Sequence, residues 1–142
     1  MKKALGIVFI IFFVATVGSS LVYRIFNYDG ILKKEHDLKV TFQSIVQPTT
    51  AQELDVKIRG KMVKRWLVAR YKYDMTDENV EKYFMEELSK EGWVKKGVRN
   101  APNERFRTSI YEKGMYEVSI GTETNYWVII MNYRDIFDSL GL

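Results

Sequence analysis

Cysteine is absent from this chain of 142 residues, and histidine occurs only once, as His36. The absence of cysteine excludes disulfides, thiolate zinc sites, cysteine nucleophiles and the acylated cysteine of a bacterial lipoprotein. His36 lies in a charged stretch, KKEHDLK, and a single histidine cannot provide a two-histidine metal site. The sequence also has no glycine-rich phosphate loop and no G-x-S-x-G nucleophile motif. We therefore expect no cofactor, no metal site and no catalytic residue of these classes.

An excess of charge of one sign is also lacking. The formal net charge is +4, and Lys2 and Lys3 contribute half of it, so residues 4–142 carry 20 basic and 18 acidic side chains. This balance is too small to indicate a nucleic-acid partner. The hydrophobic share of 46% and the aromatic share of 14% are sufficient for one packed domain.

One long hydrophobic run opens the chain, in the segment MKKALGIVFIIFFVATVGSSLVYR. Between Lys3 and Arg24, every residue from Ala4 to Tyr23 is uncharged. A helix of about 20 residues is about 30 Å long, which matches the hydrocarbon core of a bilayer. The sequence therefore predicts a transmembrane signal-anchor at residues 1–24, with residues 4–23 in the lipid bilayer of a bacterial cytoplasmic membrane.

Two other interpretations of this segment stay open. The small residues from Thr16 to Ser20 offer a cleavage site to a signal peptidase, and the domain would then be secreted. The segment could also be a buried helix of a soluble domain, although so long an uncharged run rarely fits inside a small domain. Lys2 and Lys3 favour a cytoplasmic N-terminus, whereas Arg24, Lys33 and Lys34 favour the opposite orientation. We expect the short basic tail to stay in the cytosol and the domain to lie outside the membrane.

The same segment resembles the start of a type IV pilin or pseudopilin, because a short basic leader and Gly6 precede a long apolar stretch. The resemblance covers about the first twenty residues and implies a pseudopilin-like subunit. The chain departs from the family at Ile7, where a phenylalanine or methionine follows the processed glycine, and at Ile11, where the family requires a glutamate. The sequence NYDG at residues 27–30 is also expected to interrupt the long helix that a pilin continues.

Beyond the hydrophobic run, residues 25–36 are predicted to form a juxtamembrane linker with a turn at Asp29-Gly30. In the following segment, DLKVTF, Leu38, Val40 and Phe42 alternate with polar residues, which predicts a strand with one buried face. The segment TAQELDVKIRG is ambiguous, because a capping-box spacing overlaps an apolar alternation. We expect a short helix or turn there, followed by a strand.

The segment MVKRWLVARYKYD predicts a strand, because branched and aromatic residues dominate it and alternate between two faces. The face expected in the core carries Val63, Leu67, Ala69, Tyr71 and Tyr73. The opposite face carries Lys64, Trp66, Val68, Arg70 and Lys72.

The segment MTDENVEKYFMEELSKEGW at residues 75–93 carries six carboxylates and is either an acidic site or a helical scaffold. Thr76 is a good N-cap, and Gly92 followed by Trp93 predicts a Schellman end. The expected buried stripe consists of Val80, Tyr83, Phe84 and Leu88. The spacing also predicts two exposed i,i+4 pairs, Glu78–Lys82 and Glu86–Lys90. Because these features explain nearly every residue, we favour the scaffold.

After this helix the pattern predicts an antiparallel meander. WVKKGV begins a strand, and RFRTSIYEKGMYEVSIG forms a hairpin that turns at Lys113-Gly114. Its expected inward residues are Phe106, Thr108 and Ile110 on one strand and Tyr116, Val118 and Ile120 on the other. YWVIIMNY is apolar on both faces, which predicts a central strand. The expected fold is α+β, with an N-terminal transmembrane helix before a small two-layer domain at residues 37–142, in which one main helix packs on an antiparallel sheet.

If these registers hold, an aromatic and basic surface lies on the sheet face away from the helix. Aromatic rings interleaved with cations suit an anionic polymer, an acidic glycan or a protein partner. The candidate residues are Lys64, Trp66, Arg70, Lys72, Arg107, Tyr111, Lys113 and Trp127, with Met131 and Tyr133 beside them. The alternative is that residues 31–60 fold over this face and turn it into a second core.

The sequence thus favours a membrane-anchored, non-enzymatic binding or accessory protein of the bacterial cell envelope, whose partner is another envelope protein or an anionic envelope polymer. A tether raises the local concentration of nearby partners, so weak contacts suffice. An immunity or inhibitor protein is a narrower version. The alternative is an envelope enzyme acting on cell-wall or lipid substrates, which would need two convergent carboxylates in a cleft. From Tyr71 to Tyr133 the order of elements is similar to that of many small bacterial envelope proteins, a likeness that transfers no functional residue.

Overall fold

The computed structural model describes residues 10–19, 22, 28–61, 64–100, 107–123 and 125–134. The described chain forms a helical stretch at residues 10–19 and two longer helices, α2 (Tyr28–Gln43) and α3 (Asp77–Lys90). It also forms six strands: β1 (Gln52–Lys61), β2 (Lys64–Lys72), β3 (Val94–Asn100), β4 (Arg107–Lys113), β5 (Tyr116–Glu123) and β6 (Tyr126–Tyr133).

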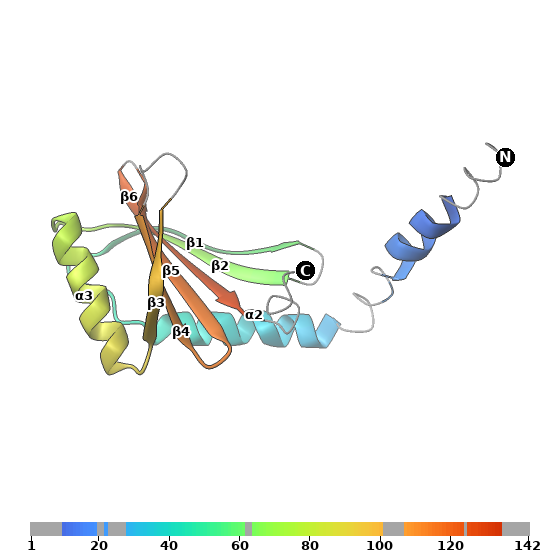
Figure 1. Cartoon of the computed structure of the whole chain (residues 1–142), viewed down its shortest axis with the longest axis horizontal. Helices are drawn as coiled ribbons and strands as arrows, with labels where there is room; N and C mark the ends of the chain where they lie inside the picture. The colour runs from blue at the N-terminus through green and yellow to red at the C-terminus, as the bar shows by residue number, and fades with distance from the viewer. Residues whose placement is uncertain are drawn as a thin grey trace.

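The six strands make one antiparallel sheet in the order β1-β2-β6-β5-β4-β3. The hairpin β1–β2 and the meander β3 to β6 are joined where β2 pairs with β6. The prediction that YWVIIMNY forms a central strand is confirmed, because β6 has a paired strand on each side. Figure 1 shows α2 running along the sheet and α3 standing at the end of the sheet away from the start of α2.

Both helices pack on the same face of the sheet, and the core lies between them and the strands. From α2 and the turn after it, Leu38, Phe42 and Ile45 enter the core. From α3 the contribution is Val80, Phe84 and Leu88, while the sheet supplies mainly Leu67, Ala69, Tyr111, Val118, Ile129 and Met131. The expected α+β class with a helix on an antiparallel sheet is therefore confirmed, with a second helix on the same layer.

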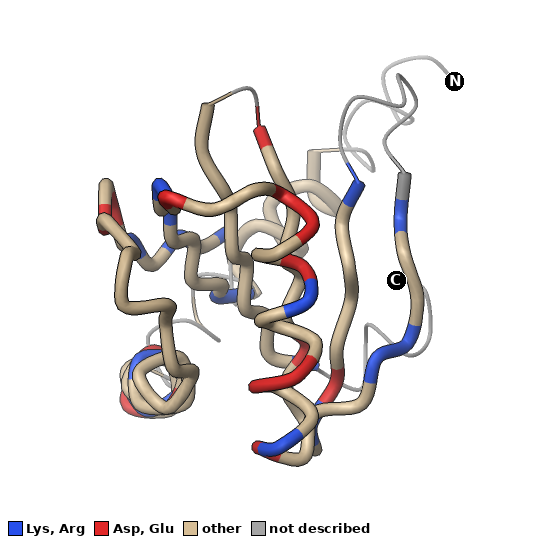
Figure 2. The backbone as a smooth tube through the Cα atoms, turned by 90° about the vertical axis from the view of Figure 1, so that its left-hand side faces the viewer, with Lys and Arg blue, Asp and Glu red and all other residues tan. Residues whose placement is uncertain are grey.

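The ends of α3 follow the sequence prediction. The hydroxyl of Thr76 accepts a hydrogen bond from the backbone N–H of Asn79 at 3.4 Å. Gly92 has φ of 81°, and the N–H of Trp93 donates to the carbonyl of Leu88 at 2.8 Å, which is the long bond of a Schellman end. One detail differs, because Lys90 pairs with Glu87 at 2.5 Å rather than with Glu86. The carboxylates of α3 are exposed or half-buried, and Figure 2 marks their positions along the helix in red.

The strand predicted for DLKVTF is wrong, because this segment is the C-terminal half of α2. Leu38 and Phe42 lie four residues apart, a spacing that puts them on one side of a helix as well as on one side of a strand. The helix also places Ile31 on its buried side and leaves the side chain of Val40 51% exposed. The predicted turn at Asp29-Gly30 is likewise wrong, since both residues lie in the first turn of α2.

The register predicted for two strands is also wrong. In β4 the buried residues are Ser109 and Tyr111, so Thr108 and Ile110 face the other side of the sheet. In β6, Trp127 and Met131 are buried among the core residues rather than on the outer face. The inward series of β2 and β5 is confirmed for Leu67, Ala69, Tyr71, Val118 and Ile120. Val63 and Phe106 lie outside the described residues.

The helical stretch at residues 10–19 stands apart from the sheet in Figure 1. The five side chains from Ile10 to Val14 are 59–69% exposed. Within the part of the chain that the structure describes, no helix combines the length and the apolar character needed to cross a membrane.

Candidate functional site

The face of the sheet opposite the helices carries a stripe of apolar side chains on its central strands. In an antiparallel pair, residues directly across from one another point to the same side. Val68 faces Ile130 in this way, and Arg70 faces Val128. Trp66 continues the stripe towards the start of β2. Val68 is 9% exposed, and the other members are half-buried. We call this surface the open face, because α2 and α3 both lie on the other side of the sheet.

Cations line one side of the open face, on the hairpin β1–β2. The register places six basic side chains on this side, which we call the basic ribbon: Lys57, Arg59, Lys61, Lys64, Arg70 and Lys72. The carboxylate of Asp55 lies among these cations and pairs with Lys57 at 3.0 Å and with Arg70 at 3.1 Å. At the end of the hairpin Lys61 lies directly across from Lys64, so two basic side chains stand side by side. The ribbon is therefore a concentrated positive surface beside apolar side chains.

Arg70 is the most firmly held cation of the ribbon. Its Nη1 donates to Asp55, and its guanidinium lies 5.8 Å from the centre of the Tyr126 ring. Its Nε is buried and has no hydrogen-bond partner among the described residues. Because a cation in this position is oriented before a ligand arrives, it can bind an anionic group with little further loss of side-chain freedom.

The eight residues predicted to form a binding surface divide into three groups. Lys64, Trp66, Arg70 and Lys72 lie together on the outward side of β2, as the sequence indicated. Tyr111 and Trp127 are only 1% and 5% exposed and belong to the core. Arg107 and Lys113 are exposed at the two ends of β4, and Lys113 lies near Glu91, at 4.0 Å. The one-residue shift of the β4 and β6 registers separates these last four residues from the open face.

Three cations of the ribbon were missed from the sequence, namely Lys57, Arg59 and Lys61. Their signal was available in the segment DVKIRGK, where Val56 and Ile58 alternate with basic residues. Once one series of an alternating strand is assigned to the core side, the other series must face outward.

The alternative in which residues 31–60 cover the open face is wrong for the described residues. Residues 28–43 form α2 on the helix side, and residues 52–61 form β1 at the edge of the same sheet. The cations of β1 therefore extend the open face instead of hiding it.

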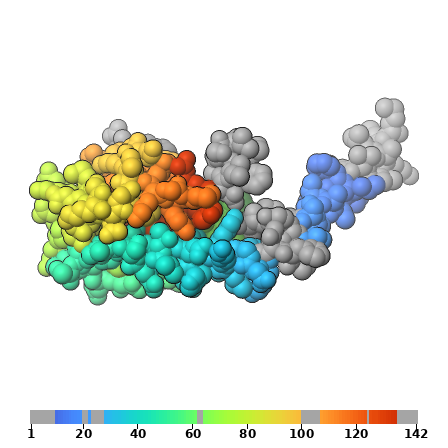
Figure 3. Space-filling model, turned by 90° about the horizontal axis from the view of Figure 1, so that it is seen from below, coloured from blue at the N-terminus to red at the C-terminus, as the bar shows by residue number. Residues whose placement is uncertain are grey.

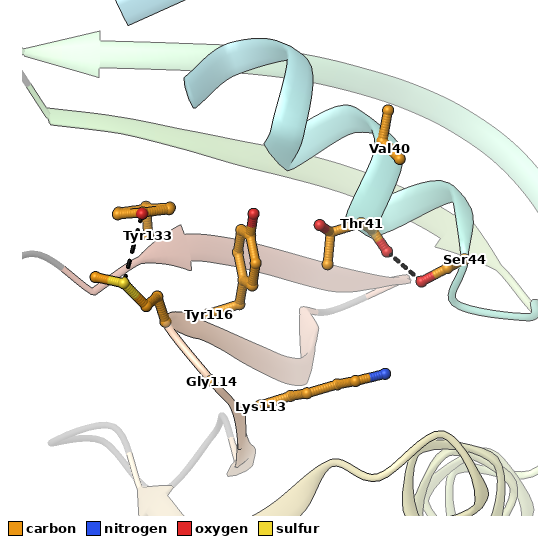
Figure 4. Close-up of a pocket in the computed structure, with 8 residues that line it drawn as sticks. Val40, Thr41, Ser44, Lys113, Gly114, Tyr116 and Tyr133 are labelled. Atoms are coloured by element: carbon orange, nitrogen blue, oxygen red, sulfur yellow. Dashed lines mark hydrogen bonds between the residues drawn. The ribbon is translucent and has the colours of Figure 1, made fainter. Parts of the chain in front are cut away.

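A second candidate is a groove of about 540 Å³ between α2 and the turn that joins β4 to β5. Figure 3 shows α2 lying beside this hairpin, and Figure 4 shows the residues that line the groove. The lining consists of Val40, Thr41, Ser44, Lys113, Gly114, Met115, Tyr116 and Tyr133. Tyr116 packs edge-on against Tyr133, with 5.4 Å between the ring centres, and the Tyr133 hydroxyl lies 3.5 Å from the sulfur of Met115. Among the residues that the structure describes, the lining offers hydroxyls and one ammonium and contains no carboxylate for acid-base chemistry.

The tyrosines between the sheet and the helices are perturbed by their surroundings. Burial raises the pKa of Tyr71 well above its ordinary value, and the nearby Glu53 carboxylate raises it further. The Tyr71 hydroxyl donates to Glu53 Oε2 at 3.1 Å, while Tyr73 donates to Gln47 Oε1 at 2.9 Å. Burial also raises the pKa of Tyr73. The first bond joins β2 to β1, and the second joins the end of β2 to the segment after α2. The tyrosines therefore act in packing.

His36 lies exposed on α2. In the described ranges, no three side chains of His, Asp or Glu come together as metal ligands would. No protein-family model, curated protein or solved structure matches this chain.

Proposed function

We propose that this chain is a membrane-tethered binding or accessory protein of the bacterial cell envelope, and that it holds a protein partner on the open face. The observation that supports the proposal is the combination of a half-buried apolar stripe and the basic ribbon on one side of the sheet. Neither helix of the domain covers this side. In its narrower form the proposal is an immunity or inhibitor protein that blocks a toxin or enzyme at the membrane.

The tether is proposed from the sequence. The twenty residues from Ala4 to Tyr23 carry no charge and match the thickness of a bilayer. The exposed apolar side chains from Ile10 to Val14 agree with this proposal, because the folded domain does not cover them. The orientation proposed from Lys2 and Lys3 places the domain outside the cytoplasmic membrane.

The chemistry of the open face suggests the kind of partner. Trp66 and the branched residues beside it form an apolar centre, and cations stand along one side of it. Such a surface fits an apolar patch edged by carboxylates on another envelope protein. Because both proteins would share one membrane, their effective concentration is high and a modest affinity suffices.

The proposal is tested by photocrosslinking in intact cells. A photoreactive amino acid at Trp66 or Ile130 should give an adduct with one envelope protein, because both positions lie on the open face. The same amino acid at Glu86, exposed on α3, is the matched control and should give none. Charge reversal by Arg70→Glu should abolish the adduct. Equal adducts from both faces, or adducts with anionic polymer alone, would contradict the proposed protein partner.

Membrane topology is tested separately. Reporter fusions after Leu142 should be active only outside the cytoplasm, and the chain should remain in the membrane fraction after an alkaline wash. A reporter active in the cytosol would overturn the proposed location. A chain released by the wash would favour the secreted alternative.

A further inference from the structure

Among the described residues, those around the start of α2 and those of α3 differ in charge. At the end where α2 begins, five basic side chains stand on the three elements α2, β1 and β2, and we call them the tether-end cluster: Lys33, Lys34, Arg59, Lys61 and Lys64. The carboxylates on the same elements there are Asp29, Glu35 and Asp37, and Glu35 is paired with Arg65. The opposite end carries α3, with five carboxylates and two lysines. Figures 1 and 2 show this helix far from the start of α2 and rich in acidic residues.

Two contacts fix this arrangement. The ion pair between Arg65 Nε and Glu35 Oε1, at 2.8 Å, holds the start of β2 against the second turn of α2. The hairpin end with Lys61 and Lys64 is therefore beside the first half of α2. At the other end, the hydroxyl of Tyr83 donates to the carbonyl of Val46 at 3.4 Å, so α3 stands beside the segment that follows α2. The charge difference is thus built into the packing of the domain.

The basic end lies close to the proposed tether. From Tyr23, the last residue of the uncharged run, to Tyr28, the first residue of α2, the chain can reach at most about 18 Å. From there Glu35 lies about 10 Å further along the helix. The cations of the tether-end cluster can therefore touch the lipid headgroups to which the domain is tethered.

We infer that the tether-end cluster docks on the anionic lipid headgroups of the membrane that anchors the chain, so that the domain stands with its acidic helix α3 away from the surface. This inference rests on the proposed tether. Each cation near an anionic surface favours the docked state by about fivefold, and the attraction decays within a Debye length of about 8 Å. An anionic surface repels the acidic α3, so the docked domain has one preferred orientation on the membrane. Arg59, Lys61 and Lys64 also belong to the basic ribbon, so docking would engage that end of the ribbon and leave the part of the open face around Val68, Arg70 and Lys72 accessible at the side of the domain.

The test uses the full chain in lipid nanodiscs and energy transfer from a single dye to acceptor lipids in the headgroup layer. The chain has no cysteine, so Leu32→Cys and Met85→Cys each provide one labelling position. The two are matched, since Leu32 on α2 is 45% exposed and Met85 on α3 is 44% exposed. Adding phosphatidylglycerol to phosphatidylcholine should raise the transfer from position 32 and should not raise it from position 85.

Charge reversal identifies the docking residues. The double variant Arg59→Glu/Lys61→Glu should lose the effect of phosphatidylglycerol, as should the unchanged chain in concentrated salt. The control Lys82→Glu/Lys95→Glu makes the same change in net charge at the other end of the domain and should keep the effect. If both variants lose it, or if position 32 does not respond to phosphatidylglycerol, docking by this cluster is overturned.

The same samples separate this inference from the proposed tether. A chain that stays in the nanodisc and shows no response to lipid charge contradicts the docking alone. A chain that does not stay in the nanodisc contradicts the tether, and the docking with it. Binding of the cluster to an acidic protein or to a soluble polyanion, with no response to phosphatidylglycerol, would also contradict the inference.

Discussion

At the scale of single residues, Gly92 shows how a local conformation is enforced. Its φ of 81° lies in the left-handed region that side chains other than glycine rarely adopt, whereas no neighbouring atom would meet an added Cβ. We expect Gly92→Val to lower the free energy of unfolding by about 1–3 kcal/mol through backbone strain alone. The measurement is urea unfolding of the full chain in detergent. Gly97→Ala is the control, since Gly97 lacks positive φ and has room, and it should change stability little.

A second prediction concerns the ion pair that joins β2 to α2. The Arg65 side chain is 9% exposed and Glu35 is 29% exposed, so removing the carboxylate leaves a mostly buried cation less well paired. We expect Glu35→Gln to lower the free energy of unfolding by about 1–3 kcal/mol. Gly60 lies across from Arg65, and a Cβ there would stand 2.8 Å from Arg65 Cδ. Gly60→Ala should therefore move Arg65 and weaken the same contact.

The double variant distinguishes a shared cause from two separate ones. If Gly60→Ala acts by displacing Arg65, its cost should shrink when Glu35 is already replaced, because the ion pair is then absent. The loss of unfolding free energy in the double variant should be smaller than the sum of the two single losses by more than about 0.5 kcal/mol. Fully additive costs would show that Gly60 matters for a reason other than the path of Arg65.

At the scale of secondary-structure elements, α3 answers whether the acidic segment is a site or a scaffold. Phe84 is 1% exposed in the core, whereas Glu86 is exposed on the same helix. We expect Phe84→Ala to lower the free energy of unfolding by about 3–5 kcal/mol, and Glu86→Ala to lower it by less than about 0.5 kcal/mol. Thermal melting of the full chain in detergent measures both. A larger loss for Glu86→Ala would contradict the scaffold interpretation.

The sequence predicted α3 well and α2 poorly, for a physical reason. In α3 the N-cap, the C-terminal glycine and a stripe at helical spacing all indicate the same structure. In α2 the pair Leu38 and Phe42 fits both a helix and a strand, and Val40 between them favours the strand by its branching. What decides is the contact of Leu38 and Phe42 with the sheet, which a local pattern does not contain.

The candidate surface could be predicted only as far as the strand registers could. On β2 the apolar and basic series differ clearly, so Lys64, Trp66, Arg70 and Lys72 were placed together correctly. On β4 both series mix polar and apolar residues, Thr108 and Ile110 against Ser109 and Tyr111, so the pattern does not select a face. On β6 both series are apolar, and only the pairing with β2 puts Trp127 and Met131 in the core.

At the scale of the whole molecule, the buried tyrosines predict how stability depends on pH. Burial raises the pKa of Tyr71, Tyr73 and Tyr111 above their ordinary values. The unfolded chain therefore loses these protons near pH 10, while the folded chain retains them to higher pH. The native state then binds more protons than the unfolded state, so the free energy of unfolding falls as the pH rises above about 10. Below that pH these groups leave it unchanged.

The size of this alkaline loss can be bounded and measured. Each retained proton lowers the unfolding free energy by at most about 1.4 kcal/mol per pH unit, and partial access of water to the rings makes the total smaller than three such contributions. Urea unfolding between about pH 9 and pH 11 should show that the free energy of unfolding starts to fall near pH 10.

The variant Tyr73→Phe keeps the ring and removes one titrating hydroxyl, so it should make this fall less steep. It also loses the hydrogen bond to Gln47 at all pH values. Tyrosinate absorbance should rise for these residues together with the loss of circular dichroism, because the folded domain must open before they ionise. Ionisation of all three in the still-folded domain would contradict this coupling between the core and the alkaline limit of the fold.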